Sequence, residues 1–273
     1  MSGPSRFLSR WGFPRLAGEW ELPADPAAFP VFLLMGQSNM AGWSRLDLSN
    51  PSEAGDFSPV PRVLALGGQC TLKSRRPRGW MRWRPAAHPL HLNQKGAGFG
   101  LGLSFASRLL EEKPALTIGL IPCAWGGAGI DQLGPGTPLY DNAVVRARKA
   151  ELRGTLTGVL WHQGETDALS ESLAPSHAGK LAALIARLRS DLAAPQLPFL
   201  IGGLGTFGDE KRDAAAIARQ IVVRSGLRQV AGETAHAAFV ESDGLEGVDD
   251  VHFSRAALVE FGQRYAEAYL GLR

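Results

Sequence analysis

A serine with the setting of a catalytic nucleophile directly follows a strand-like apolar run. The run 31–35 ends at Gly36, and three hydrogen-bonding side chains follow it: Gln37, Ser38 and Asn39. A hydroxyl held at the rim of a rigid strand can act as a nucleophile if a base lies beside it. A serine at a strand end is more often a turn or helix-cap residue. The interpretation therefore depends on finding a base and a group that orients it.

The best candidate base among the six histidines is His252. It lies in a loop before the C-terminal helical pattern, and Asp249 stands three residues upstream. One short loop can present both side chains, so that the carboxylate accepts from one imidazole nitrogen while the other nitrogen faces Ser38. The aspartate would fix the tautomer and stabilise the imidazolium.

Acyl transfer also requires donors for a developing oxyanion. Three sources are present: the backbone N–H of Ser38, a backbone N–H of Gly126 or Gly127, and the side-chain amide of Gln163. Each also has an ordinary structural reading, because glycines form tight turns and a buried amide is usually satisfied by neighbours. The choice between the two glycines stays open.

Strand and helix patterns alternate along the chain, which is typical of β-α-β units with a parallel sheet and helices on both faces. In such sheets the working loops lie at the carboxyl ends of the strands. The expected strands are 31–35, 62–66, 116–121, 157–161, 198–204 and 237–240, and the expected helices are 101–112, 139–150, 172–193, 211–228 and 254–270. Ser38, the glycine pair, Gln163 and His252 each follow a strand in this scheme, so we expect them to meet.

Several blocks of the sequence resemble a known family. "GQSNMAG" (36–42), "GLIPCAWGGAGI" (119–130), "WHQGETD" (161–167) and "DDVHFS" (249–254) are similar to the motifs of SGNH-type, GDSL-related serine esterases. They resemble most the branch that contains sialate O-acetylesterases and the acetylxylan esterases of carbohydrate esterase family six. The segment "GFGLGLSFA" (98–106) resembles a further family segment.

The resemblance implies a three-layer α/β/α sandwich around a mostly parallel, five-stranded sheet of flavodoxin-like order. It implies a serine carbohydrate esterase that needs no metal or cofactor and hydrolyses O-acetyl esters through an acetyl-enzyme. The implied nucleophile is Ser38, with His252 as base and Asp249, rather than the adjacent Asp250, as its partner. Gln37, Asn39 and Trp125 are candidate substrate-binding residues.

The resemblance covers about residues 30–270, so we expect an esterase domain over 30–273 and an N-terminal extension, 1–29, packed on it. Two alternatives stay open: a non-catalytic carbohydrate-binding protein on the same fold, and a lipase or thioesterase of broader acyl specificity. Neither the acetylated alcohol nor the oligomeric state follows from the sequence.

The composition of the chain argues against several classes of protein, namely nucleic-acid-binding, disulfide-rich and membrane proteins. The 273 residues are 45% hydrophobic with a net charge of +3, which suits one globular domain and gives no reason to expect a nucleic-acid partner. The two cysteines, Cys70 and Cys123, form no disulfide framework. No export signal or membrane-spanning run is recognisable, so we expect a cytoplasmic protein without membrane contact. Secreted family members that act on polymers begin with export signals, which argues against a polymeric substrate such as xylan here.

Four further features of the sequence have simple structural interpretations. The basic and aromatic segment 73–84 is most simply a solvated loop, with a sugar-binding cleft wall as the alternative. His88 and His91 lack a third ligand of suitable spacing for a metal. The glycines of "GAGFGLG" (96–102) do not meet the dinucleotide-binding pattern. Glu165 is expected to brace a loop or cap a helix.

Overall fold

A wide, mostly parallel sheet forms the centre of the computed structural model, which describes residues 21–43, 58–68, 81–92 and 96–272. In these residues seven strands have the order β3-β2-β4-β1-β5-β6-β7. Every neighbouring pair is parallel except β2 and β3. The strands are β1 (Pro30–Gly36), β2 (Val63–Leu66), β3 (Trp83–Pro85), β4 (Ile118–Pro122), β5 (Thr155–His162), β6 (Phe199–Gly202) and β7 (Ala237–Val240).

The sheet is wider than the five strands that the family resemblance implied and the six that the sequence pattern predicted. The five strands β4-β1-β5-β6-β7 have the expected flavodoxin-like order, 2-1-3-4-5, when counted along the chain. Beyond them, β2 and the antiparallel β3 extend the β4 edge. The six expected strands are all present, and the additional one is β3, whose three residues end in a proline and give no strand pattern.

The central strand β1 is buried on both faces, which explains its continuous apolar sequence. Side chains alternate along it: Val31, Leu33 and Met35 pack into one core cluster, whereas Phe32 and Leu34 pack into the other. Two separate cores on opposite faces of one sheet give the three-layer α/β/α sandwich.

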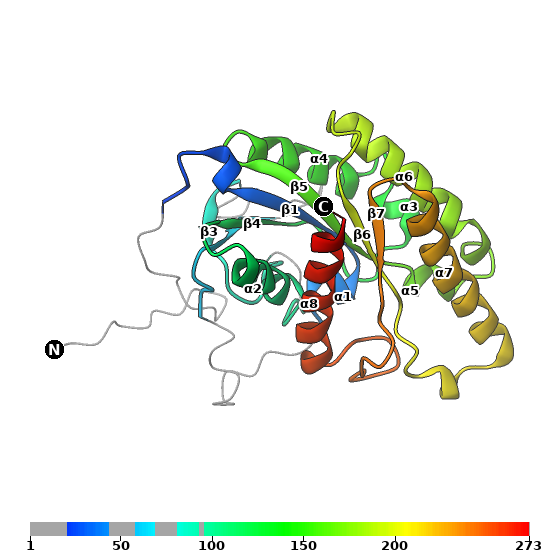
Figure 1. Cartoon of the computed structure of the whole chain (residues 1–273). Coiled ribbons are helices and arrows are strands. Elements are labelled where there is room, and N and C mark those ends of the chain that lie inside the picture. The colour runs from blue at the N-terminus through cyan, green and yellow to red at the C-terminus, as the bar shows by residue number, and fades with distance from the viewer. Residues whose placement is uncertain (1–20, 44–57, 69–80, 93–95, 273) are drawn as a thin grey trace.

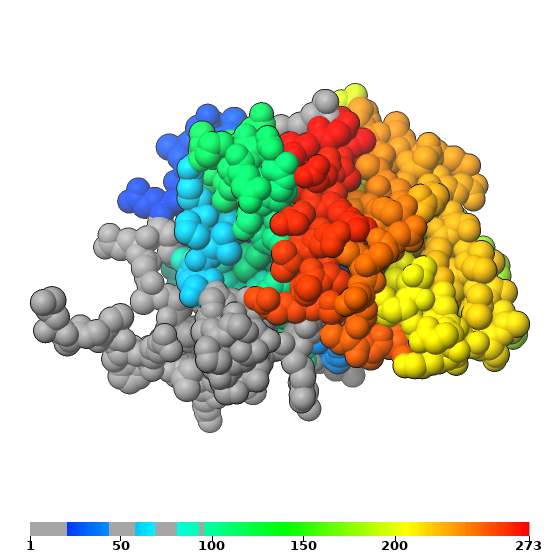
Figure 2. All heavy atoms as spheres, turned by 60° about the horizontal axis from the view of Figure 1, so that its bottom comes forward, coloured from blue at the N-terminus to red at the C-terminus, as the bar shows by residue number. Residues whose placement is uncertain are grey.

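Helices cover both faces of the sheet (Figure 1). On one face lie α3 (Ile130–Leu133), α4 (Pro138–Glu151), α6 (His177–Asp191) and α7 (Ala214–Glu233), and on the other lie α2 (Gly102–Glu112) and α8 (Arg255–Gly271). Figure 2 shows α8, in red, packed beside α2, in green. The expected apolar stripe of α6 is confirmed, since Leu181, Leu184, Ile185 and Leu188 are all buried. The other elements of the described residues are the single turns α1 (Ser38–Ala41) and α5 (Glu165–Ala168) and the 3-10 turns Pro26–Ala28, Ala174–Ser176 and Asp209–Lys211.

Gly36 closes β1 in a conformation that requires glycine. Its φ is +134°, and a Cβ at this position would lie 1.9 Å from the carbonyl oxygen of His162 on β5. The absence of a side chain lets the two strand ends approach closely, and the chain can then turn at once into the segment that carries Ser38.

The N-terminal extension that we expected over 1–29 lies mostly outside the described residues. Within it, Asp25 caps the turn Pro26–Ala28 and Phe29 is fully buried. A packed extension therefore stays a prediction. Among the described residues, no helix is both long and apolar enough to cross a membrane.

Candidate active site

The Ser38 hydroxyl lies at the carboxyl edge of the sheet, in the one-turn helix that follows β1. Two backbone hydrogen bonds fix this turn: Gln37 N–H donates to the His162 carbonyl at 2.9 Å, and Trp125 N–H donates to the Gly36 carbonyl at 2.9 Å. The turn is thereby attached to the ends of both neighbouring strands, β5 and β4. Ser38 itself is only 4% exposed.

Ser38, His252 and Asp249 form a continuous hydrogen-bonded chain. His252 Nε2 lies 3.0 Å from Ser38 Oγ, and His252 Nδ1 lies 2.8 Å from Asp249 Oδ2. Because an ionised carboxylate can only accept, Nδ1 carries the ring proton and Nε2 is left to accept from the Ser38 hydroxyl. The structure thus brings together the nucleophile, base and orienting group that the sequence indicated.

Asp249 is held as a carboxylate by its own loop. Its Oδ1 accepts from the backbone N–H groups of Val251 at 2.8 Å and His252 at 2.7 Å. Burial raises the pKa of Asp249, but the hydrogen bonds from His252 and Val251 together lower it below the ordinary 3.8. The acid is therefore charged at neutral pH and can stabilise an imidazolium.

The adjacent Asp250 pairs with a lysine rather than with His252, although it also lines the pocket in front of Ser38. Its Oδ1 accepts from Lys211 Nζ at 2.5 Å, in an exposed ion pair. The helix after this loop is capped by Ser254, whose hydroxyl accepts from Ala257 N–H at 3.1 Å. The three-residue offset, rather than direct adjacency, brings a carboxylate beside the histidine.

Asn39 fastens the His252 loop to the nucleophile turn. Its Nδ2 donates to the Val251 carbonyl at 3.0 Å, and its Oδ1 accepts from Phe253 N–H at 3.1 Å. The two contacts lie on either side of His252. Nδ2 also donates to Glu165 Oε1 at 2.6 Å, and the same oxygen accepts from His162 Nε2 at 2.9 Å. Asn39 is buried and does not line the pocket, contrary to its expected contact with substrate, and Glu165 braces the loops as expected.

A pocket of about 370 Å³ opens in front of Ser38 and His252. Gln37, Gly126 and Gly127 also line it, so the glycine loop after β4 reaches the nucleophile as expected. Gly127 has φ of +72° and open space where a Cβ would be. Its backbone N–H has no acceptor within the described part of the chain.

Apolar side chains form another part of the pocket lining. They are those of Trp43, Leu169, Leu204 and Phe207. The Trp43 ring stacks on the His252 imidazole, with centroids 5.5 Å apart and planes 22° apart, and it is 38% exposed. Sequence reasoning missed Trp43, although its position immediately after the "GQSNMAG" block was a usable signal. The expected substrate contact Trp125 does not line the pocket and packs against the larger core cluster.

Gln163 lies beneath the pocket rather than in it. It is fully buried, and its Nε2 donates to the Ala128 carbonyl at 3.2 Å and to Asp167 Oδ2. Asp167 in turn accepts from Ile130 N–H at 3.0 Å, at the start of α3. Gln163 thereby holds the glycine loop through its hydrogen bond to Ala128. Its side chain does not line the pocket, contrary to the position that we expected of an oxyanion donor.

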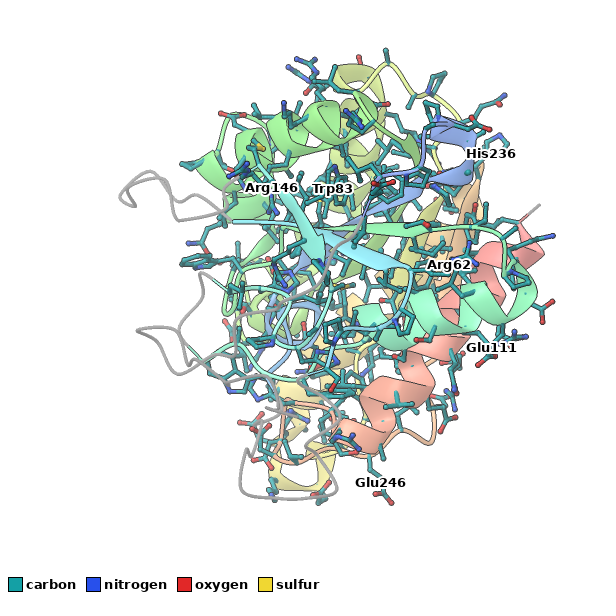
Figure 3. The ribbon with its side chains drawn as sticks, turned by 90° about the vertical axis from the view of Figure 1, so that its left-hand side faces the viewer. Arg62, Trp83, Glu111, Arg146, His236 and Glu246 are labelled. Carbon is teal, nitrogen blue, oxygen red and sulfur yellow. The ribbon has the colours of Figure 1, made fainter. Side chains whose placement is uncertain are left out.

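The basic and aromatic segment 73–84 is described only from residue 81 onward, and none of its described residues lines the pocket. Trp83 packs edge-on against Phe29 in the core at 4.8 Å and lies on the same side of the sheet as Arg146 (Figure 3). His91 has a structural contact, since its Nε2 accepts from Ala124 N–H at 3.2 Å. Burial lowers the pKa of His91 to about 3, which keeps the ring neutral for this contact.

Comparisons with known proteins show what the chain as a whole is similar to. A probable carbohydrate esterase from Arabidopsis thaliana is 31% identical over 252 residues, covering 88% of this chain and 90% of the relative. A solved structure of the same Arabidopsis protein has a TM-score of 0.75 at 29% identity, covering 90% of this chain and 99% of that one.

More distant solved structures share the fold. NanS has a TM-score of 0.69 at 20% identity, covering 91% of this chain and 98% of that chain. A carbohydrate acetylesterase from Xanthomonas citri has a TM-score of 0.63 at 19% identity, covering 88% of this chain and 55% of that chain. The architecture is that of SGNH-type hydrolases. The family model for "Carbohydrate esterase, sialic acid-specific acetylesterase" matches residues 28–271, and this chain belongs to that family.

Proposed function

We propose that this protein is a serine esterase that removes O-acetyl groups from a sugar or a related small molecule. The observation that carries the proposal is the hydrogen-bonded chain from Ser38 through His252 to Asp249 at the floor of the pocket. Membership of a carbohydrate esterase family supports the substrate class. A triad of this geometry is suited to acyl transfer, whatever fold presents it.

In the first half of the reaction, Ser38 Oγ attacks the acetyl carbonyl carbon while its proton moves to His252 Nε2. The carbonyl π electrons move onto oxygen, and the backbone N–H groups of Ser38 and the glycine loop can donate to that oxyanion. When the intermediate collapses, the carbon–oxygen bond to the sugar breaks and the sugar oxygen takes the proton from Nε2. Acetyl-Ser38 and a free hydroxyl remain.

In the second half, a water molecule takes the place of the sugar. His252 Nε2 removes a proton from it, and the hydroxide oxygen bonds to the acetyl carbon. Collapse of this second intermediate breaks the bond to Ser38 Oγ, which recovers its proton from Nε2, and acetate leaves. Asp249 stays ionised throughout, because hydrogen bonds hold its pKa below the ordinary value.

The partly exposed ring of Trp43 supports a sugar as the alcohol component. Its ring forms part of the pocket wall and is stacked on His252, so a pyranose lying on it would place an acetylated hydroxyl near the nucleophile. The family description favours an acetylated sialic acid, and an acetylated xylose unit is the other candidate from the sequence.

The test is acetate release by the purified protein from a panel of acetylated sugars that includes O-acetyl sialic acids and acetylated xylo-oligosaccharides. Hydrolysis of p-nitrophenyl acetate measures the chemistry independently of the sugar. Release of acetate that Ser38→Ala abolishes is the expected result. Activity that instead rises with acyl chain length would indicate a lipase or thioesterase, and no hydrolysis of any ester would indicate a binding protein.

A further inference from the structure

The donors of the Gln163 side chain are already used inside the protein. Three acceptors surround the two hydrogens of its Nε2: the Ala128 carbonyl at 3.2 Å, Gln37 Oε1 at 3.3 Å and Asp167 Oδ2. Its Oε1 faces His177 Nε2 at 2.9 Å. A carbonyl oxygen can only accept, so the Ala128 contact fixes which end of the amide carries nitrogen. No N–H of this side chain is left to turn toward the pocket.

The Gln37 side chain is held by its oxygen, whereas the Gln163 amide is held at both its nitrogen and its oxygen. Its Oε1 faces three donors: Thr166 N–H at 3.3 Å, Gly164 N–H at 3.5 Å and Gln163 Nε2 at 3.3 Å. Two of these are backbone N–H groups, which can only donate, so the oxygen of the Gln37 amide must be the end that faces them. The Nε2 group is then the end that faces away from β5 and α5.

Gln37 Nε2 is a donor without a partner beside the nucleophile. Within the described residues it has no hydrogen-bond acceptor, although Gln37 as a whole is only 2% exposed. Gln37 lines the same pocket as Ser38, to which it is directly bonded in the chain. A buried polar group is normally satisfied, and one left open at a reactive centre is available to a reacting atom.

We infer that Gln37, not Gln163, supplies the side-chain donor of the oxyanion hole. When Ser38 Oγ bonds to the acetyl carbon and the carbonyl electrons move onto oxygen, Gln37 Nε2–H donates to that oxygen beside the backbone donors. Gln163 is a positioning residue, because it holds the Gln37 amide by its oxygen and the glycine loop through Ala128. The inference depends on the proposed esterase activity.

Two variants of Gln37 separate donation from mere support. Gln37→Glu keeps an oxygen for Thr166 and Gly164 but has no N–H, whereas Gln37→Met removes both functions without adding charge. We expect each to lower kcat on p-nitrophenyl acetate by about 10²-fold or more while KM changes little, since the lost bond forms in the transition state. Gln163→Ala is expected to lower kcat less than either.

The thermal midpoint of each variant is measured to show that it is folded. A loss of less than about tenfold in kcat for either folded Gln37 variant would overturn the inference, as would a larger loss for Gln163→Ala than for both Gln37 variants. Labelling of Ser38 by a fluorophosphonate in the wild-type protein is measured alongside. Wild-type protein without ester hydrolysis would refute the proposed function itself, whereas active wild type with active Gln37 variants refutes only the assignment of Gln37.

Discussion

Replacing Asp249 by asparagine tests the triad, and the structure determines how the new amide would face. Asp249 Oδ1 accepts from the backbone N–H groups of Val251 and His252, and Oδ2 faces His252 Nδ1. Only the oxygen of an asparagine can accept those two backbone bonds, so its nitrogen would face Nδ1. Nδ1 must then accept, the ring proton moves to Nε2, and Ser38 loses its base.

The expected loss of kcat in Asp249→Asn follows from the free energy needed to turn the asparagine amide over. Turning the amide over restores the working tautomer but gives up two backbone hydrogen bonds, at about 0.5–1.5 kcal/mol each. If that orientation were fully active, kcat would still fall roughly 5- to 160-fold, at 1.36 kcal/mol per factor of ten. Loss of the negative charge adds to this, although the Asp249 side chain is 51% exposed and water screens it. We expect a loss of about 10²-fold, smaller than the ~10⁴-fold known for the protease triad.

The assay compares Asp249→Asn with Asp250→Asn on one acetyl ester at a fixed, mildly alkaline pH. Asp250 pairs with Lys211 at the surface, with side chains 48% and 62% exposed, and such a pair contributes little. Its variant should change kcat by less than about tenfold. If Asp249→Asn retained activity within about fivefold of wild type, or if Asp250→Asn were the more damaging, the triad reasoning would be refuted.

Three further predictions concern the same site. Ser38→Ala should abolish hydrolysis and fluorophosphonate labelling while the thermal midpoint stays close to wild type, and labelling at another residue would contradict the assignment. Asn39→Ala removes three hydrogen bonds, one of them to a carboxylate, so we expect the free energy of unfolding in urea to fall by roughly 2–5 kcal/mol. We also expect a lowered kcat. An unchanged free energy of unfolding would show that the His252 loop does not depend on Asn39. Burial raises the pKa of Glu165, but the opposing effects of His162 and Asn39 are larger and leave this pKa below its ordinary 4.5. The ionised Glu165 therefore stabilises the fold above that pH, and this contribution is lost as the pH falls. The thermal midpoint of wild type should therefore fall more steeply than that of Glu165→Gln below about pH 4.5, and parallel curves would contradict this.

The family resemblance implied the order of the five strands β4-β1-β5-β6-β7, and the alternation of strand and helix patterns predicted the convergence of the site. A continuous apolar run of strand length such as 31–35 is typical of a strand buried on both faces of a parallel sheet, and parallel strands bring their carboxyl ends to one edge. Placing Ser38 and His252 beyond strand ends predicts that they share one edge of the sheet, and the hydrogen bonds of Asn39 to the His252 loop complete their approach to 3.0 Å. The spacing from Asp249 to His252 worked for the same kind of reason, since a tight turn closes over three residues.

The sequence could not predict the direction of individual side chains just beyond a strand. Side chains alternate along β5, so Trp161 faces the core under α6, His162 faces Phe253 and Phe261, and Gln163 returns to the α6 side beside His177. This alternation is visible only when the strand end is known to within one residue, which sequence patterns do not give. Gly164, with φ of +144°, then turns the chain away at that point.

The three amides around Ser38 have separate tasks because each faces a different neighbour. Asn39 faces the loop that carries His252, Gln163 faces the loop that carries the glycine N–H groups, and Gln37 faces the pocket. An amide suits all three positions because it donates and accepts at once and adds no charge beside the nucleophile. The side chains of Glu165 and Asp167 accept from two of these amides and so fix their orientation. The groups that must meet a transition state are thus held in place before substrate arrives, and a shift of any one amide would displace a different part of the reaction: the base, the backbone donors or the oxyanion itself.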